Sequence, residues 1–205
     1  MLIIDCVQKS DEWYKEKLGK PSASNASQIV TNEGNRSKSA EGYMYELAAE
    51  IITGQRVEGY QNSNMLMGNE REEESRSFYE LKFDVEVKQV GVIYKDEEKK
   101  FLCSPDGIVL PPLNGHYGIE MKNVLPKTQV KYLLNNKLPS EYFSQIQFSL
   151  YVTGFERWDF MSYSPLLKPL VVRVNRDEKF LKALKVELEI FCGELESVVA
   201  KLKEK

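Results

Sequence analysis

Histidine and cysteine, which build many catalytic and metal sites, are scarce in this sequence. It has one histidine, His116, and three cysteines, Cys6, Cys103 and Cys192, among 205 residues. The cysteines are far apart and lack the paired spacing of zinc sites, iron–sulfur clusters or disulfide frameworks, so we expect free thiols. A nucleophile activated by histidine is excluded unless His116 is used, and its Pro/Asn/Gly-rich surroundings favour a solvated loop residue.

Long apolar runs and an excess of basic residues are also missing. No run approaches the roughly 20 residues of a membrane-spanning helix, and the N-terminus has no basic segment followed by an apolar stretch. We therefore expect a soluble cytoplasmic protein with no membrane partner. With 28 basic and 31 acidic residues the formal net charge is −3. Any contact with nucleic acid must therefore rest on a local basic surface.

The composition is that of a folded domain. Hydrophobic residues make up 42% and aromatic residues 11% of the chain. These fractions argue for a globular fold and against disorder. The length suits a single domain, covering residues 1–205, with a sizeable core.

Two short apolar runs of β type flank a Pro-Pro-Leu-Asn-Gly connection, which predicts a hairpin. Asp106 opens the first strand, and Glu120 and Lys122 lie on the second. Because side chains alternate along a strand, Glu120 and Lys122 share one face while Ile119 and Met121 point into the core. Asp106, at the turn into the partner strand, can reach the same place.

This arrangement of two carboxylates and a lysine indicates a particular chemistry. Neighbouring carboxylates repel, and a hard divalent cation bound through oxygen is the usual way to hold them together. Mg²⁺ bound there would activate water and offset charge on phosphorus, while the lysine orients the water or helps to deprotonate it. The pattern therefore fits hydrolysis of a phosphodiester.

The same residues carry a family resemblance. Pro105-Asp106, thirteen intervening residues and Glu120-Met121-Lys122 match the PD-(D/E)XK nuclease signature. The extended form, Cys-Ser-Pro-Asp-Gly followed by Glu-x-Lys, resembles the phage lambda exonuclease-like (viral recombinase) family. The resemblance implies an α/β, restriction-endonuclease-like core: a central mixed β-sheet flanked by helices, with a long C-terminal helix. It also implies that Asp106 and Glu120 bind the metal and that Lys122 acts on the water.

A second match lies near the N-terminus. Trp13, a basic residue, Leu-Gly and Ser-Ala-Ser resemble the family's opening motif, whose basic residue and last serine hold a 5′-terminal phosphate. The resemblance assigns these roles to Lys17 and Ser24, and adds Ser104 to the same site. The family favours arginine at the position of Lys17, so the bidentate fork is lost and neighbouring lysines could assist. Alternatively, Lys17 is a solvated helix residue and Ser24 caps the next helix.

Three further residues are assigned from the resemblance. Glu72 follows a glycine by four residues, as does a glutamate that faces the family's site. Asp96 falls where the family has an additional acid, and Gln145 is the first glutamine of a Gln-x-Gln that lines the active site. The alternatives are a solvated acidic helix face for Glu72, a local turn role for Asp96 and an exposed helical position for Gln145.

Met65 and Leu66 align with the part of the family that wedges apart the duplex end. Ordinary packing or a hydrophobic staple is an equal alternative for this pair.

A long C-terminal helix is predicted from an apolar seam after a capping sequence around Asp177. We expect this helix to lie across the sheet, with a subunit contact as the alternative. The seam consists of Leu181, Leu184, Leu188, Phe191, Leu195, Val198 and Leu202.

Taken together, the resemblance implies an Mg²⁺-dependent exonuclease, with Mn²⁺ able to substitute. It would digest one strand of duplex DNA from the 5′ end to 5′-mononucleotides and leave a 3′ overhang. The family also implies a ring-shaped homotrimer around DNA, a single-strand annealing partner in phage-type recombination, and the host cytoplasm as the location.

Two other functions remain open. One is a PD-(D/E)XK structure-specific endonuclease or junction resolvase, which would nick closed circular DNA. The other is a catalytically silent DNA-binding module. The intact charged trio argues against the silent module, because such a module has no evident reason to bury these three side chains.

Overall fold

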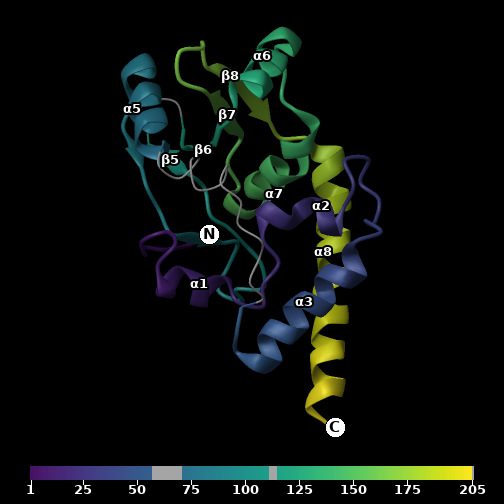
Figure 1. Ribbon diagram of the computed structural model, residues 1–205. Helices are drawn as coiled ribbons and strands as arrows, with labels where there is room; N and C mark the ends of the chain where they lie inside the picture. Colours follow the sequence, from purple (N-terminus) through teal and green to yellow (C-terminus); the bar gives the residue numbers. More distant parts are fainter. Residues whose placement is uncertain (57–70, 111–114, 205) are drawn as a thin grey trace.

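The computed structural model describes residues 1–56, 71–110 and 115–204 (Figure 1). Its centre is a mixed sheet in the order β2-β5-β6-β7-β8. The strands are β2 (Val87–Lys88), β5 (Gly107–Val109), β6 (Tyr117–Asn123), β7 (Arg157–Tyr163) and β8 (Leu170–Asn175). β6 and β7 run parallel, and the other neighbours are antiparallel. A smaller antiparallel sheet pairs β3 (Val92–Tyr94) with both β1 (Leu2–Ile4) and β4 (Leu102–Cys103).

Several of the helices in the described residues have recognisable caps. They are α1 (Asp11–Lys17), η1 (Ala23–Asn25), α2 (Ala26–Ile29), α3 (Ala40–Thr53), α5 (Glu72–Phe83), α6 (Pro126–Asn135), η2 (Ser140–Tyr142), α7 (Phe143–Thr153) and α8 (Glu178–Lys203). Asp177 caps α8 by accepting a bond of 2.9 Å from the N–H of Phe180. Gly54 and Gly154 end α3 and α7 in the left-handed conformation that glycine adopts without steric cost.

Helices cover both faces of the central sheet. On one face, Ile119, Met121 and Met161 pack with Tyr79 of α5. On the other face, Trp158 and Phe160 of β7 join the larger core, to which α2, α3, α7 and α8 contribute. The alternation predicted for β6 is therefore confirmed, because Ile119 and Met121 are buried on the α5 side.

The predicted long helix is present, but its position differs from the expectation. α8 packs chiefly against α3 and α7, and Figure 1 shows it running beside α3. The rings of Phe191 on α8 and Tyr43 on α3 stack at 5.7 Å. The expectation that α8 lies directly across the sheet was therefore wrong, since α7 already covers that face and α8 forms a layer outside it.

Some boundaries are shorter than the sequence pattern indicates. The alternating run 85–90 forms a strand only at Val87–Lys88, because β5 offers pairing partners only to these two residues. Of the helices in the described parts of the chain, none has the length and apolar character needed to cross a membrane.

Candidate active site

The β5–β6 hairpin brings the charged trio together. Asp106 immediately precedes β5, and its Oδ2 accepts a hydrogen bond of 2.6 Å from the backbone N–H of Met121. On β6, the Nζ of Lys122 lies 2.5 Å from Oε1 of Glu120. Glu120 is only 3% exposed, whereas the Lys122 side chain is 30% exposed. The three side chains therefore form one cluster that is open to solvent on the lysine side.

The charges in this cluster perturb one another strongly. Burial and the nearby charge of Glu120 raise the pKa of Asp106 to about 7, against the opposing effects of Lys122 and the Met121 N–H. Burial alone would lower the pKa of Lys122, but the carboxylates of Glu120 and Asp106 outweigh it and raise that pKa. At neutral pH Lys122 is therefore an ammonium ion.

The donor set fits a hard divalent cation. Within 1–56, 71–110 and 115–204, no three His, Cys, Asp or Glu side chains are grouped as a ready-made metal cage. Mg²⁺ characteristically takes one or two carboxylates and completes its octahedron with water and phosphate oxygens. Asp106 and Glu120 provide such a pair, and in the described residues neither Oδ1 of Asp106 nor Oε2 of Glu120 accepts a hydrogen bond.

Glu72 is the first residue of α5. Its charge contributes to the raised pKa of Asp106. Both of its carboxylate oxygens accept bonds from Nζ of Lys9, at 2.7 and 2.8 Å. Glu72 is therefore held by a lysine that the sequence patterns did not single out, and the residue before that lysine, Gln8, bonds the carbonyl that precedes Asp106.

Lys17 and Ser24 line one cavity of about 620 Å³, together with Trp13, Lys20 and Arg56. The Nζ of Lys17 lies 4.0 Å from the centre of the Trp13 ring. Burial, and then the charge of Arg56, lower the pKa of Lys17 to about 8. Lys17 is thus not a solvated helix residue, and a cavity with three cations suits an anion.

Ser24 and Ser104 make different contributions to this region. Ser24 lies within η1, and Asn25, not Ser24, is the residue before α2. Ser104 accepts a bond of 2.8 Å from Nε1 of Trp13 and donates one of 2.6 Å to the carbonyl of Gly91. Ser104 therefore fixes the ring on which Lys17 rests.

The cavity adjoins the carboxylate cluster. Cys103 is fully buried in β4, where burial and the charge of Glu120 raise its pKa and Lys17 opposes them. The charge of Glu120 also acts on Lys17. The connection is also structural, because Trp13 lines the cavity and bonds Ser104, which lies two residues before Asp106.

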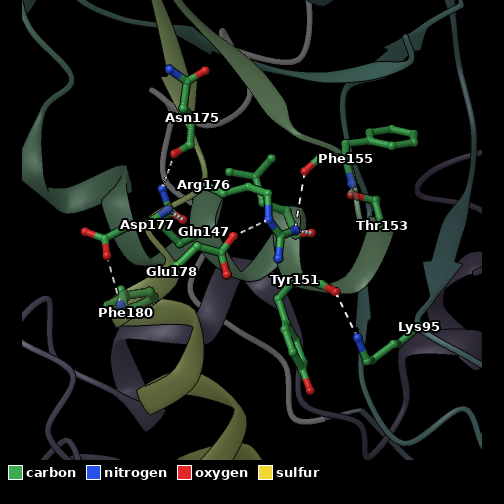
Figure 2. A network of polar contacts seen from close by, with 11 residues as sticks. Lys95, Gln147, Tyr151, Thr153, Phe155, Asn175, Arg176, Asp177, Glu178 and Phe180 are labelled. Atoms are coloured by element: carbon green, nitrogen blue, oxygen red, sulfur yellow. Dashed lines mark hydrogen bonds and ion pairs between the residues drawn. The ribbon is translucent and has the colours of Figure 1, made fainter.

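The two glutamines of the Gln-x-Gln sequence have different surroundings. Gln147 is buried; its Nε2 donates to the carbonyl of Asn175 and its Oε1 accepts from the N–H of Asp177, both at 2.9 Å. Figure 2 shows this network joining α7 to the start of α8. Gln145 is half-buried in the first turn of α7. This end of α7 is near the cluster, because Lys122 Nζ lies 5.3 Å from the ring centre of Tyr142.

The remaining assignments are not joined to the cluster by any described contact. Asp96 lies in the exposed turn between β3 and β4, where its Oδ1 accepts a bond of 3.1 Å from the N–H of Glu98. Its role as an additional acid stays a prediction. Met65 and Leu66 lie outside the described residues.

Sequence reasoning missed Arg56 and Lys9. Arg56 follows the glycine that ends α3, and only the fold shows that its guanidinium lines the cavity, 4.4 Å from the ring centre of Tyr14. Lys9 lies 63 residues from its partner, a separation that no local pattern can reveal.

Comparison with known proteins agrees with the fold and the motifs. A model of the YqaJ-like viral recombinase domain matches residues 12–156. An alkaline exonuclease of Laribacter hongkongensis, also solved in complex with dAMP, is 29% identical with a TM-score of 0.84, covering 95% of this chain and 97% of that chain. A phage-related exonuclease of Haemophilus somnus, 13% identical with a TM-score of 0.67, covers 89% of this chain and 96% of that one and shows likeness of fold.

A viral relative is also similar in sequence. An uncharacterized protein of Acanthamoeba polyphaga mimivirus is 26% identical over 166 residues, or 75% of this chain. This chain spans only 28% of the length of that protein. The family match covers more than half of the chain and includes the whole charged trio, so the resemblance read from the motifs is confirmed: the chain belongs to the family of YqaJ-like viral recombinase domains.

Proposed function

We propose that the chain is a Mg²⁺-dependent exonuclease that removes 5′-mononucleotides from one strand of duplex DNA, starting at the 5′ end. The observation that carries the proposal is the bond between Asp106 and the N–H of Met121, which fixes one carboxylate against the strand that bears Glu120 and Lys122. The structural similarity to an alkaline exonuclease supports a nuclease, and membership of the recombinase family supports a role in recombination.

Each member of the trio has a role in this reaction. Asp106 and Glu120 would hold Mg²⁺, or Mn²⁺ in its place, and the bound metal would supply Lewis-acid chemistry at the phosphodiester. Lys122 keeps its proton, so it donates hydrogen bonds and orients the attacking water or offsets charge on phosphorus. Gln145, at the start of α7, is proposed to line the site beside Lys122.

The phosphate cavity supports the 5′ polarity. Water attacks the phosphorus of the second nucleotide, the bond to the 3′-oxygen of the first nucleotide breaks, and that oxygen leaves as a hydroxyl. The terminal nucleotide departs as a 5′-mononucleotide, and the new end again carries a 5′-phosphate. A cationic cavity next to the carboxylates, lined by Lys17, Arg56 and Ser24, would receive that phosphate after each cleavage.

The family resemblance supports three further proposals about assembly. We propose a homotrimeric ring around DNA, because an acidic chain can then keep its basic surface on the inside. A single-strand annealing recombination protein would take up the 3′ overhang. Met65 and Leu66 are proposed to wedge the duplex end, and Asp96 to act as an additional acid.

The deciding experiment is digestion of linear duplex DNA labelled at one 5′ or one 3′ end, in Mg²⁺, beside a closed circle. The 5′ ends carry either phosphate or hydroxyl, and Lys122→Ala is the control variant. Early release of the 5′ label, faster with phosphate and absent in the variant, is the expected result. Nicking of the circle would establish the endonuclease instead, and binding without cleavage would establish the silent module.

A further inference from the structure

The segment just ahead of the family match touches the backbone that carries Asp106. Cys6 packs so closely on Gly91 that a Cβ at Gly91 would lie 2.3 Å from the sulfur of Cys6. Nε2 of Gln8 donates bonds of 2.7 Å to the carbonyl of Pro105 and 2.8 Å to that of Val90. Because Pro105 directly precedes Asp106, Gln8 fixes the chain from which that carboxylate extends.

Lys9, the next residue, makes the bidentate ion pair with Glu72 described above. Its φ is 68°, in the left-handed region that is strained for a residue other than glycine. The two side chains are 40% and 39% exposed, and exposed ion pairs contribute little to stability. The pair therefore gives the fold little net stability, and any larger effect must come from its position.

The pair lies next to the proposed metal site, because Lys9 follows Gln8 and the Gln8 side chain bonds the carbonyl of Pro105, the residue before Asp106. Without Lys9, the Glu72 carboxylate would stand near Asp106 and Glu120 without its cation. We propose that Lys9 is a positioning residue that holds and neutralises Glu72, and thereby sets the Mg²⁺ affinity of Asp106 and Glu120. This inference rests on the proposed nuclease function. Lys9 lies three residues before the segment that the family model matches, residues 12–156.

The expected effect follows from electrostatics. Removing one positive charge near a divalent cation strengthens its binding by about three- to tenfold at the high effective dielectric of a solvent-exposed site. The released Glu72 carboxylate also becomes able to turn toward the metal, which adds to the gain. The effect should therefore be clearly smaller when Glu72 is made neutral.

The left-handed backbone allows a clean substitution. Lys9→Gly removes the ammonium and suits a φ of 68°, so the fold should persist, and Lys9→Arg keeps the charge. Lys99 offers a matched control: it also has a positive φ, 53°, and its exposed ammonium is 3.8 Å from the half-buried carboxylate of Glu16. Lys99→Gly therefore reproduces the backbone change away from the carboxylate cluster.

The test is calorimetric titration of Mg²⁺ into the full DNA-free chain. Lys9→Gly should bind Mg²⁺ about three- to tenfold more tightly than wild type. Lys9→Arg and Lys99→Gly should match wild type, and Lys9→Gly should have a clearly smaller effect in a Glu72→Gln background. Unchanged affinity in Lys9→Gly, or an equal change with and without Glu72, overturns the inference.

Parallel cleavage assays separate this inference from the proposed function. If wild type binds Mg²⁺ but cleaves no DNA, the nuclease proposal fails, and the titrations still decide the role of Lys9. If wild type cleaves while Lys9→Gly shows the wild-type Mg²⁺ affinity and Mg²⁺ requirement, only the role of Lys9 is lost. If wild type binds no Mg²⁺, both proposals are overturned.

Discussion

Asp106 is bonded to the backbone of Met121, the residue between Glu120 and Lys122. This single bond of 2.6 Å sets the register of one carboxylate against the two side chains on the neighbouring strand. The pleat places the side chains of Glu120 and Lys122 on one face of β6 and that of Met121 on the other. Because the bond to Asp106 uses only the backbone of Met121, all three charged side chains remain available to the site.

Asp106→Asn tests the charge of this carboxyl while its amide oxygen keeps the Met121 bond. We expect cleavage to fall by about 100-fold or more, because a metal ligand loses its charge.

The raised pKa of Asp106 means that the folded protein binds one more proton than the unfolded chain at pH values between the ordinary pKa of an aspartate and about 7. Wild-type stability should therefore decline as pH rises through that window in EDTA, by about 1–2 kcal/mol more than in the variant.

Urea denaturation at pH 5 and pH 8 measures this difference. Both proteins should be similar at the lower pH, where Asp106 is largely protonated, and should diverge at the higher pH. If the stability of the two proteins changes with pH in the same way, ionisation of Asp106 costs the fold no stability.

Lys17 gives a second pH-dependent prediction. Its pKa of about 8 means that its positive charge, and with it the preference for a 5′-phosphate over a 5′-hydroxyl, is lost as pH rises above that value. Lys17→Arg should keep the preference up to pH 10, since guanidinium stays protonated, and Lys17→Met should reduce it about tenfold at pH 7.

The ratio of cleavage rates on the two DNA ends, measured from pH 7 to 10, checks this prediction. Lys15→Met, an exposed position on the same helix, is the control and should keep the wild-type ratio. A wild-type ratio in Lys17→Met would remove Lys17 from the phosphate site.

Local patterns predicted the hairpin and its trio, because strand alternation and turn residues act over a few positions. The cap at Asp177 was predicted for the same reason. Lys9 and Arg56 were not, since their partners come from distant segments. The place of α8 depended on which apolar surfaces α3 and α7 leave uncovered, and a single helix does not carry that information.

Gly118 tests how closely β6 and β7 must approach. A Cβ at this position would lie 2.2–2.4 Å from three atoms of the buried Trp158 ring. Gly118→Ala should destabilise the fold by about 1–3 kcal/mol through overpacking. Gly193→Ala on α8, where a Cβ meets nothing within 4 Å, should instead stabilise it by about 0.5–1 kcal/mol. Equal urea midpoints for the two variants would contradict the packing of Trp158.

Gln145 and Gln147 lie on the same helix and separate catalysis from stability. Gln147→Leu leaves the carbonyl of Asn175 and the N–H of Asp177 without their partner, and should destabilise the fold by about 1–3 kcal/mol. Gln145→Ala should leave the free energy of unfolding within about 0.5 kcal/mol of wild type. It should lower cleavage about tenfold at saturating Mg²⁺ if its amide lines the site. Urea denaturation and the end-labelled DNA assay, run on both variants, distinguish the two roles. If only Gln147→Leu loses activity, neither glutamine is catalytic, and the loss is explained by weakened folding.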